Sequence, residues 1–374
     1  MTSTWVNKPL GELVSLQRGF DLPTKNRVPG QYPVISAGES IGTHNVAKVK
    51  GPGFAIGRIT NLGQPHWSDS NFWPLNTTLF ATDFHGNNPK WLFYLFKVLD
   101  LRGFDSGSVQ PSLNRNYISN VSVSTPPRET QDNIVSVLKS LDDKIDANNR
   151  IVDCTLELQR AHWLKALFGV PSIDLSEITS PVLGGTPKRS DEALWEGTNL
   201  WASVADMTKA PHSHLVDTAE KISDEAIQTR RFSPLPTGAI LMSARGTVGR
   251  IVSTTKPTSF NQSAYGFIPP EGYGPALRLA LSDVVAELKA KSYGSVFSTI
   301  TKQQINECTV PDVFNPQFDE LHTLLNTLES RIIAAELENQ ALARTRDELL
   351  PLLMSGRITV GEAEDAADEA ASES

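Results

Sequence analysis

An apolar stripe runs through Phe318-Asp-Glu-Leu-His-Thr-Leu-Leu-Asn-Thr-Leu-Glu-Ser-Arg-Ile332 and continues to Leu353. Its positions are Phe318, Leu321, Leu325, Leu328, Ile332, Ala335, Asn339, Leu342, Arg346, Leu349 and Leu353. Alternating steps of three and four residues keep one face of a helix apolar, which is the pattern of a coiled coil. The sequence therefore predicts a long helix over residues 312–357. Its expected seam contains Leu321, Leu325, Leu328, Ile332, Asn339 and Leu342.

A second stripe of this kind begins after Pro126-Pro127 and predicts a long helix over residues 127–170. Its seam residues are Ile134, Leu138, Leu141 and Ile145, spaced four, three and four. Asn148 interrupts this stripe as Asn339 interrupts the other, and such polar positions select register and partner at a cost in stability. Ordinary amphipathic helices that cover domain cores would show a similar period. However, ~40 helical residues span about 60 Å, which is long for a helix that only covers a small domain.

The second half of the chain echoes the first, because four short motifs recur in the same order. The pairs are Leu10-Gly-Glu-Leu-Val14 with Leu175-Ser-Glu-Ile-Thr179, Gly57-Arg-Ile59 with Gly249-Arg-Ile251, Gly107-Ser-Val109 with Gly294-Ser-Val296, and Leu141-Asp-Asp-Lys-Ile145 with Leu328-Glu-Ser-Arg-Ile332. An internal repeat of this length indicates two copies of a whole domain followed by a helix. A domain–helix–domain–helix order would let the two helices pair antiparallel, with the domains related by an approximate two-fold axis.

Short apolar runs broken by Gly, Pro, Asn and Ser precede each helix and favour a compact α/β domain. We therefore predict an α/β protein of two compact domains separated by two long helices that form an antiparallel coiled coil. The predicted parts are a first domain over 1–126, a helix over 127–170, a second domain over 171–311, a helix over 312–357, and an acidic disordered tail over 358–374.

The charge distribution permits nucleic-acid binding despite a net charge of −8. Residues 1–125 contain 11 Lys and Arg against 7 Asp and Glu, whereas residues 311–374 contain 4 against 14. The acidic tail cannot bury a core, which favours disorder. No signal peptide or stretch of ~18 apolar residues is visible, and the two cysteines form no C-x-x-C pair. We expect a cytoplasmic protein without a membrane segment, a disulfide framework or a structural metal site.

Several of these motifs resemble the specificity subunits of type I restriction-modification enzymes. Pro127-Arg-Glu-Thr-Gln131 with the stripe that follows it looks like the first helix of that family, and Leu349-Leu-Pro-Leu-Leu-Met-Ser-Gly-Arg357 is similar to its closing signature. Gly107-Ser-Val-Gln-Pro-Ser-Leu113 and Gly294-Ser-Val-Phe-Ser-Thr-Ile300 resemble the segments that end its recognition domains. The second copy of the Pro127 motif, Pro311-Asp-Val-Phe-Asn-Pro-Gln317, is two residues longer, which leaves the start of the second helix uncertain.

The resemblance implies a non-catalytic subunit that reads a two-part, gapped target in double-stranded DNA. Each domain would read one half of the target, and the helices would fix the unread spacer. The helices would also dock two methyltransferase subunits and, in the full assembly, restriction subunits. The methyltransferase would use S-adenosylmethionine, whereas this chain would bind neither that cofactor nor ATP.

DNA affinity requires Lys and Arg at phosphates, so basic residues beside turn-forming residues are the candidate contacts. In the first domain they are Lys25, Arg27, Lys48, Lys50, Arg58 and Arg115. In the second they are Lys188, Arg189, Arg230, Arg231, Arg245, Arg250 and Lys302. Each could instead be a solvated surface charge. Arg58 and Arg250 follow the repeated glycines, and their alternative role is a buried structural pair with a carboxylate.

Enzymatic interpretations have little support in the sequence. Asn88-Pro-Lys-Trp91 lacks the second proline of an adenine methyltransferase motif, and there is no G-x-x-x-x-G-K-[ST] phosphate loop. Asp283 with Glu287-Leu-Lys289 resembles a nuclease site weakly, but Leu277–Lys291 favours an amphipathic helix. His212-x-His214 has no convincing third metal ligand. A protein-interaction scaffold built on a coiled coil is the non-enzymatic alternative to a DNA reader.

Overall fold

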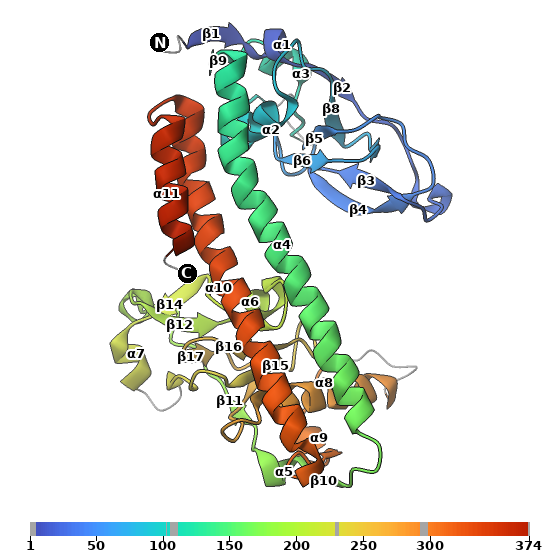
Figure 1. The fold of residues 1–374 in the computed structure, drawn as a ribbon, viewed down its shortest axis with the longest axis vertical. Helices are drawn as coiled ribbons and strands as arrows, with labels where there is room; N and C mark the ends of the chain where they lie inside the picture. Colours follow the sequence, from blue (N-terminus) through green and yellow to red (C-terminus); the bar gives the residue numbers. More distant parts are fainter. Residues whose placement is uncertain (1–4, 102, 105–110, 229–231, 292–297, 373–374) are drawn as a thin grey trace. The chain divides into compact units, whose positions relative to one another are not determined.

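The computed structural model describes residues 5–101, 103–104, 111–228, 232–291 and 298–372 (Figure 1). The chain divides into two compact units, the first of Met1–Asp143 with Ala341–Glu373 and the second of Lys144–Gln340. Two long helices, α4 (Arg128–Ala166) and α10 (Asp319–Ser355), contribute to both units. They confirm the two predicted helices; their ends lie one to four residues inside the predicted limits, except the start of α10, which lies seven residues inside. No helix in the described ranges combines the length and the apolar character needed to cross a membrane.

The first unit is a mixed α/β domain. In chain order it contains β1 (Val6–Pro9), α1 (Leu10–Leu13), β2 (Ser15–Arg18), η1 (Thr24–Asn26), β3 (Tyr32–Ser36), β4 (Glu39–His44), β5 (Gly53–Gly57), β6 (Pro65–Ser68), β7 (Trp73–Pro74), β8 (Thr78–Asp83), α2 (Pro89–Val98), α3 (Arg115–Ile118) and β9 (Ser122–Thr125). The strands form sheets in the orders β2-β8-β5-β6, β4-β3-β7 and β1-β9.

The second unit contains the same kinds of element. In chain order these are β10 (Ser172–Asp174), α5 (Leu175–Ile178), β11 (Val182–Leu183), η2 (Glu192–Trp195), β12 (Asn199–Ala202), α6 (Val204–Lys209), β13 (His214–Leu215), β14 (Glu220–Ile222), α7 (Asp224–Gln228), β15 (Ile240–Ser243), β16 (Ile251–Thr254), β17 (Thr258–Phe260), β18 (Ala264–Phe267), α8 (Gly274–Lys291), α9 (Lys302–Asn306), β19 (Thr309–Pro311) and η4 (Pro316–Phe318). Its sheets have the orders β11-β18-β15-β16-β13, β14-β12-β17 and β10-β19.

Sheet topology confirms the internal repeat. The order β2-β8-β5-β6 matches β11-β18-β15-β16, with every neighbouring pair antiparallel. The order β4-β3-β7 matches β14-β12-β17, with one antiparallel and one parallel pair in each. Strand β13, which joins β16 in parallel, has no equivalent among the described strands of the first unit. The repeated motifs at Leu10 and Leu175 form the equivalent short helices α1 and α5.

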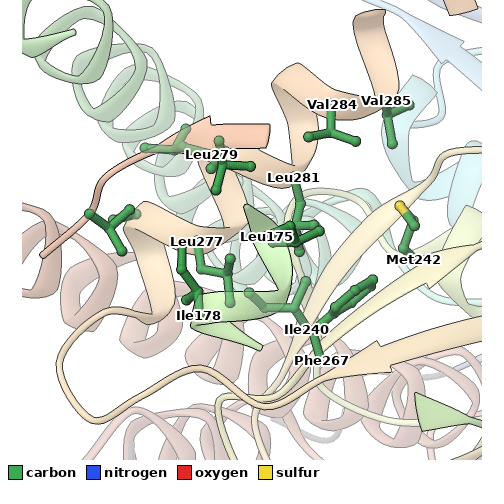
Figure 2. Close-up of a cluster of buried hydrophobic side chains, with 14 of the residues drawn as sticks. Leu175, Ile178, Ile240, Met242, Phe267, Leu277, Leu279, Leu281, Val284 and Val285 are labelled. Carbon is green, nitrogen blue, oxygen red and sulfur yellow. The ribbon is translucent and has the colours of Figure 1, made fainter. Parts of the chain in front are cut away.

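A helix packed on the main sheet forms the core of each unit. In the second unit, Leu277 and Leu281 of α8 lie with Ile240 of β15 and Phe267 of β18, and all four are fully buried (Figure 2). In the first unit, α2 is buried from Trp91 to Phe96. The side chain of Asn88 starts α2 by accepting hydrogen bonds from the amides of Lys90 and Trp91. The Asn88-Pro-Lys-Trp91 stretch is therefore a helix start with a structural reason for its asparagine.

The long helices bury most of their apolar stripe, but parts of it face domain cores. Ile134, Leu138, Leu141, Leu321, Leu325, Ile332 and Leu342 are buried, whereas Ile145, Leu328 and Asn339 are half-buried. Leu321 and Leu325 belong to the core cluster that contains α8. By contrast, Ile332 of α10 packs with Val152 of α4. The stripe therefore serves both of the roles considered from the sequence: covering a domain core and pairing two helices.

The structure shows where the second helix begins and places a further helix after Arg357. Asn315 caps the turn η4 by accepting a hydrogen bond from the amide of Gln317, and α10 follows directly at Asp319. The acidic tail, for which composition predicts disorder, contains the helix α11 (Val360–Ser372). Thr359 and Glu362 form a reciprocal capping box at its start, and the many alanines that follow favour helix.

Candidate nucleic-acid interface

Three arginines of the first unit surround one cavity of about 370 Å³. Arg18 ends β2, Arg58 follows β5, and Arg115 is the first residue of α3. The remaining lining residues are Gln17, Leu79, Ser112, Leu113 and Asn114, none of which is acidic. Arg18 and Arg115 are exposed, while Arg58 is half-buried. These three residues are called the arginine cluster below.

Backbone carbonyls hold the arginine cluster in place. Arg18 Nε and Arg58 Nη1 both donate to the carbonyl oxygen of Asn76, at 3.3 and 3.5 Å, and Arg115 Nη1 donates to that of Leu16 at 3.3 Å. In the described part of the chain, no carboxylate lies within ion-pair distance of any of the three. Burial, and then the charge of Arg18, lower the pKa of Arg58. Clustered cations without a carboxylate partner are suited to bind phosphate oxygens.

The other predicted contacts of the first unit are scattered over its surface. Lys25 is exposed in η1, and Lys50 is exposed after the bridge at Val49. Arg27 is half-buried, with Nε 3.4 Å from the carbonyl oxygen of Leu22. Lys48 Nζ lies 5.3 Å from the ring centre of Trp73, so cation–π attraction holds this lysine against the domain. None of these residues lines the cavity of the arginine cluster.

The sequence match between Gly57-Arg58 and Gly249-Arg250 is wrong. Gly57-Arg58 stands where β5 ends, whereas Gly249-Arg250 precedes β16, which is the equivalent of β6. Backbone hydrogen bonds give the correct register. The amide of Leu113 donates to the carbonyl of Arg58 at 2.7 Å, and the amide of Ile300 donates to that of Ala244 at 3.0 Å. Arg58 therefore corresponds to Ala244, beside Arg245.

This register shows which cations of the second unit occupy equivalent places. Lys302, the first residue of α9, stands two residues after Ile300 and corresponds to Arg115. Arg245 and Lys302 are both exposed. Arg18 corresponds to Leu183, the last residue of β11. The second unit thus keeps a cation at one of the three positions, Lys302, and carries Arg245 one residue past the position of Arg58.

Arg250 and Arg189 have structural partners in the second unit. The guanidinium of Arg250 donates to the carbonyl oxygens of Met207 and Ala210, at 2.9 and 2.7 Å, and to that of His212. These contacts favour a structural role for Arg250. Its partners are backbone carbonyls, whereas the sequence suggested a carboxylate. Arg189 forms two bonds to Glu220, at 2.5 and 3.0 Å, and its guanidinium carbon lies 3.8 Å from the ring centre of Trp195.

The last three predicted contacts of the second unit are Lys188, Arg230 and Arg231. Lys188 is exposed in the turn before η2, where its carbonyl accepts from the amide of Asp191 at 3.1 Å. Arg230 and Arg231 lie outside the described residues, as do the Gly107 and Gly294 motifs up to Gln110 and Phe297. Arg18 was not predicted as a contact. It stands directly before Gly19, so the rule that selected basic residues beside glycine would have included it.

A buried polar network, also missed from the sequence, joins β13 to α8 and the two long helices. His214 Nε2 lies 2.9 Å from Glu329 Oε1, and its Nδ1 lies 2.7 Å from Glu336 Oε2. Arg278 donates to Glu329 at 2.6 Å and to Gln159 at 3.0 Å. All five side chains belong to residues less than a tenth exposed. This set is called the Glu329 network below.

The Glu329 network contains charges that depend on one another. Burial favours the neutral form of each group, but the neighbouring opposite charges outweigh it. For Glu329, the charge of Arg278 and the hydrogen bond from His214 lower the pKa to about 2. For His214, hydrogen bonds and charges from Glu329 and Glu336 raise the pKa above 6.5. The carboxylates that face His214 thus favour its protonated form.

The charge of His214 predicts a loss of stability at alkaline pH. A raised folded-state pKa gives stability that is complete below the unfolded pKa of about 6.5 and is lost as the pH rises through the folded value. We expect the second unit of the wild-type protein to have a larger free energy of unfolding than that of the His214→Gln variant. This difference should be greatest at pH 6. The excess should shrink above that pH by up to about 1.4 kcal/mol per pH unit. Hydrogen exchange of β13 and α10 during a urea titration measures it, with His85→Gln as the control. An excess that stays constant from pH 6 to 9 would contradict the expectation.

Asp283 and His212, the residues behind the weak nuclease and metal hypotheses, have partners within the protein. Asp283 accepts hydrogen bonds from Arg160 at 2.5 Å and from the indole of Trp163 at 2.8 Å, so its carboxylate ties α8 to α4. His212 Nδ1 lies 3.3 Å from Glu336 Oε1. Within the ranges that the structure describes, no group of three or more His, Cys, Asp or Glu residues could hold a metal ion.

Comparisons with known proteins agree with the repeat. A family model described as the type I restriction modification DNA specificity domain matches residues 2–153 and 173–316. The chain is 22% identical over 179 residues to the type I restriction enzyme MjaIX specificity subunit of Methanocaldococcus jannaschii, covering 47% of this chain and 41% of that protein. It is also 22% identical over 188 residues to the HindI specificity subunit of Haemophilus influenzae, covering 49% and 40%. Each alignment spans about two fifths of the relative.

A solved structure shares the fold along nearly the whole chain. It is the S subunit of a type I restriction-modification system from M. genitalium, with a TM-score of 0.61 and 18% identity. The alignment covers 94% of this chain and 96% of that one. The family model covers both copies of the repeat and more than half of the residues. The chain therefore belongs to the family of type I restriction modification DNA specificity domains.

Proposed function

We propose that this chain is the non-catalytic DNA sequence-specificity subunit of a type I restriction-modification system. Its recognition domains, residues 1–126 and 171–311, each read one half of a gapped target in double-stranded DNA. The observation that carries the proposal is the pair of domains, both matched by one DNA specificity family, with an exposed cation, Arg115 or Lys302, at one equivalent backbone position of each. A reader of a two-part target needs two such surfaces on one chain.

The arginine cluster supplies the contacts of the first domain to DNA phosphates. Its guanidiniums have carbonyl partners that fix their positions and no carboxylate partner, in the described residues, that would neutralise them. Phosphate contacts position a protein on the duplex without reading its sequence. Arg245 and Lys302 provide the corresponding contacts of the second domain. Arg189 and Arg250 act structurally, because their donors are already engaged.

The two long helices pair as an antiparallel coiled coil that sets the gap between half-sites. Within the second unit, Asn148 donates to Glu338 at 2.8 Å, and Asn339 donates to Asn149 at 2.9 Å. Val152 packs with Ile332, so contact positions fall along α10 as they rise along α4. Each seam asparagine thus bonds to the opposite helix, as expected of residues that select register. The repeated order of domain and helix supports a pseudo-two-fold relation between the copies.

The protein partners follow from the same assignment. The helices dock two methyltransferase subunits, which modify adenine, and restriction subunits join them in the full assembly. This chain itself binds no cofactor. It acts in the cytoplasm, where its DNA target lies and where cysteines stay reduced. The acidic helix α11 is expected to remain away from DNA, because its charge repels phosphate.

A salt titration separates the DNA reader from a protein-interaction scaffold. The purified chain with its methyltransferase is titrated against a labelled random duplex from 0.05 to 0.3 M salt. A DNA reader shows a linear fall of log affinity with log salt, because each phosphate contact releases a counterion. A complex that forms but does not bind duplex at any of these salt concentrations would support the scaffold instead.

A further inference from the structure

One acidic position recurs in both long helices and joins its own helix to two other elements in each copy. Asp142 of α4 accepts a hydrogen bond from Tyr94 of α2 at 2.6 Å and from Arg346 of α10 at 2.9 Å. Glu329 of α10 accepts from Arg278 of α8 at 2.6 Å and from Gln159 of α4 at 2.9 Å. Asp142 and Glu329 are called the junction carboxylates below.

The two junctions are equivalent by the repeat. The junction carboxylates are the second residues of the repeated motifs that begin at Leu141 and Leu328. The number of residues from Asp142 to Gln159 along α4 equals that from Glu329 to Arg346 along α10. Tyr94 and Arg278 both come from the helix that packs on the main sheet of its domain. Each junction therefore takes its acid from one long helix, its second partner from the other, and its third from a recognition domain.

These junctions supply directional contacts between each domain and the long helices, beside those of Asn88 with Asp132 and of Asp283 with Arg160. Apolar packing is non-directional and tolerates small slips between surfaces. A hydrogen bond to a carboxylate weakens within a few tenths of an ångström and with modest changes of angle. Tyr94 and Arg346 reach different oxygens of Asp142, so both oxygens are constrained. Burial, and then the bond to Asp142, raise the pKa of Tyr94, which keeps its phenol protonated as a donor.

We propose that Asp142 and Glu329 are positioning residues that lock each recognition domain to both long helices and thereby restrict the protein to one gap length. The proposal rests on the proposed function. Successive base pairs lie about 3.4 Å apart. A displacement of this size is far larger than a hydrogen bond to a carboxylate tolerates. Neutral amides in the same places keep the volume but lose the charge-assisted bonds. A domain that has lost these contacts and keeps fewer directional ones can then adopt the shift that a longer or shorter gap requires.

The test compares methylation of duplexes that share half-sites but differ in gap. The motif is first read from DNA methylated by the wild-type chain with its methyltransferase. Duplexes are then made with that gap, one base pair more and one base pair less. We expect Asp142→Asn and Glu329→Gln to reduce the preference for the native gap at least tenfold. The matched controls are Asp143→Asn and Glu320→Gln, exposed acids on the same helices.

A second variant separates the junction from a folding defect. Tyr94→Phe removes one donor to Asp142 without changing the ring, and it should reduce the same preference by a smaller factor. Native-gap methylation should persist in all three variants. The proposal is overturned if the variants keep the wild-type preference within twofold, or if the controls lose it equally. If the wild-type chain itself directs no gapped motif, the proposed function fails and the inference fails with it.

Discussion

Replacing Arg18, Arg58 and Arg115 together with glutamine is expected to weaken DNA binding roughly a hundredfold at 0.15 M salt. The reason is that all three guanidiniums face one cavity without a carboxylate partner among the described residues. Each lost phosphate contact removes about 0.9 from the slope of log affinity against log salt, so the slope should become less steep by about 3. Fluorescence anisotropy over a salt series measures both quantities.

The control for this variant carries the same change of net charge. Arg128, Arg150 and Arg344 are exposed arginines of the long helices, and their triple glutamine variant should change binding less than threefold. Because phosphate contacts carry no sequence information, the cluster variant should weaken specific and random duplexes alike. An unchanged salt slope in the cluster variant would show that these arginines do not touch the backbone.

Removing Glu329 is expected to have the largest effect on stability. Glu329→Ala leaves Arg278 and His214 buried without the carboxylate that neutralises them. Breaking a buried ion pair by removing one partner costs about 3–5 kcal/mol. The second unit should unfold at a lower urea concentration, while the first unit should keep its stability. Hydrogen exchange followed by mass spectrometry distinguishes the two units in one sample.

Glu320→Ala is the matched control, since Glu320 lies on the same helix and is exposed. It should change the free energy of unfolding by less than about 0.5 kcal/mol. A double variant with Arg278→Met should recover part of the loss, because removing both buried charges avoids an unpaired one. Equal unfolding of Glu329→Ala and Glu320→Ala would mean that the network contributes no net stability.

Features with local causes were predictable from the sequence. The period of the apolar stripe places α4 and α10 to within a few residues, because helix contacts repeat every three or four positions. The motifs at Leu10 and Leu175 identify equivalent helices. The prediction for the tail did not consider helix capping. Thr359 and Glu362 cap the start of α11 within this acidic segment. The prediction of disorder there relied on composition alone.

Features set by distant contacts were not predictable. Gly57-Arg58 and Gly249-Arg250 look alike, but only hydrogen bonds between separate strands reveal that they occupy different places. Arg189 resembles any exposed cation until Glu220 is brought against it. His214 offered only a weak metal signal, since Glu329 and Glu336 lie more than a hundred residues away in sequence. In each case a partner remote in sequence decides what the side chain does.

The central claim, that this chain specifies a two-part DNA target, is tested most directly by sequencing methylated DNA. Host DNA is sequenced by a single-molecule method, with the methyltransferase present throughout and the chain either present or absent. The account predicts adenine methylation in one new gapped motif that occurs only when the chain is present, and the motif gives both half-sites. Unchanged methylation from a chain that co-purifies with the methyltransferase would contradict the account.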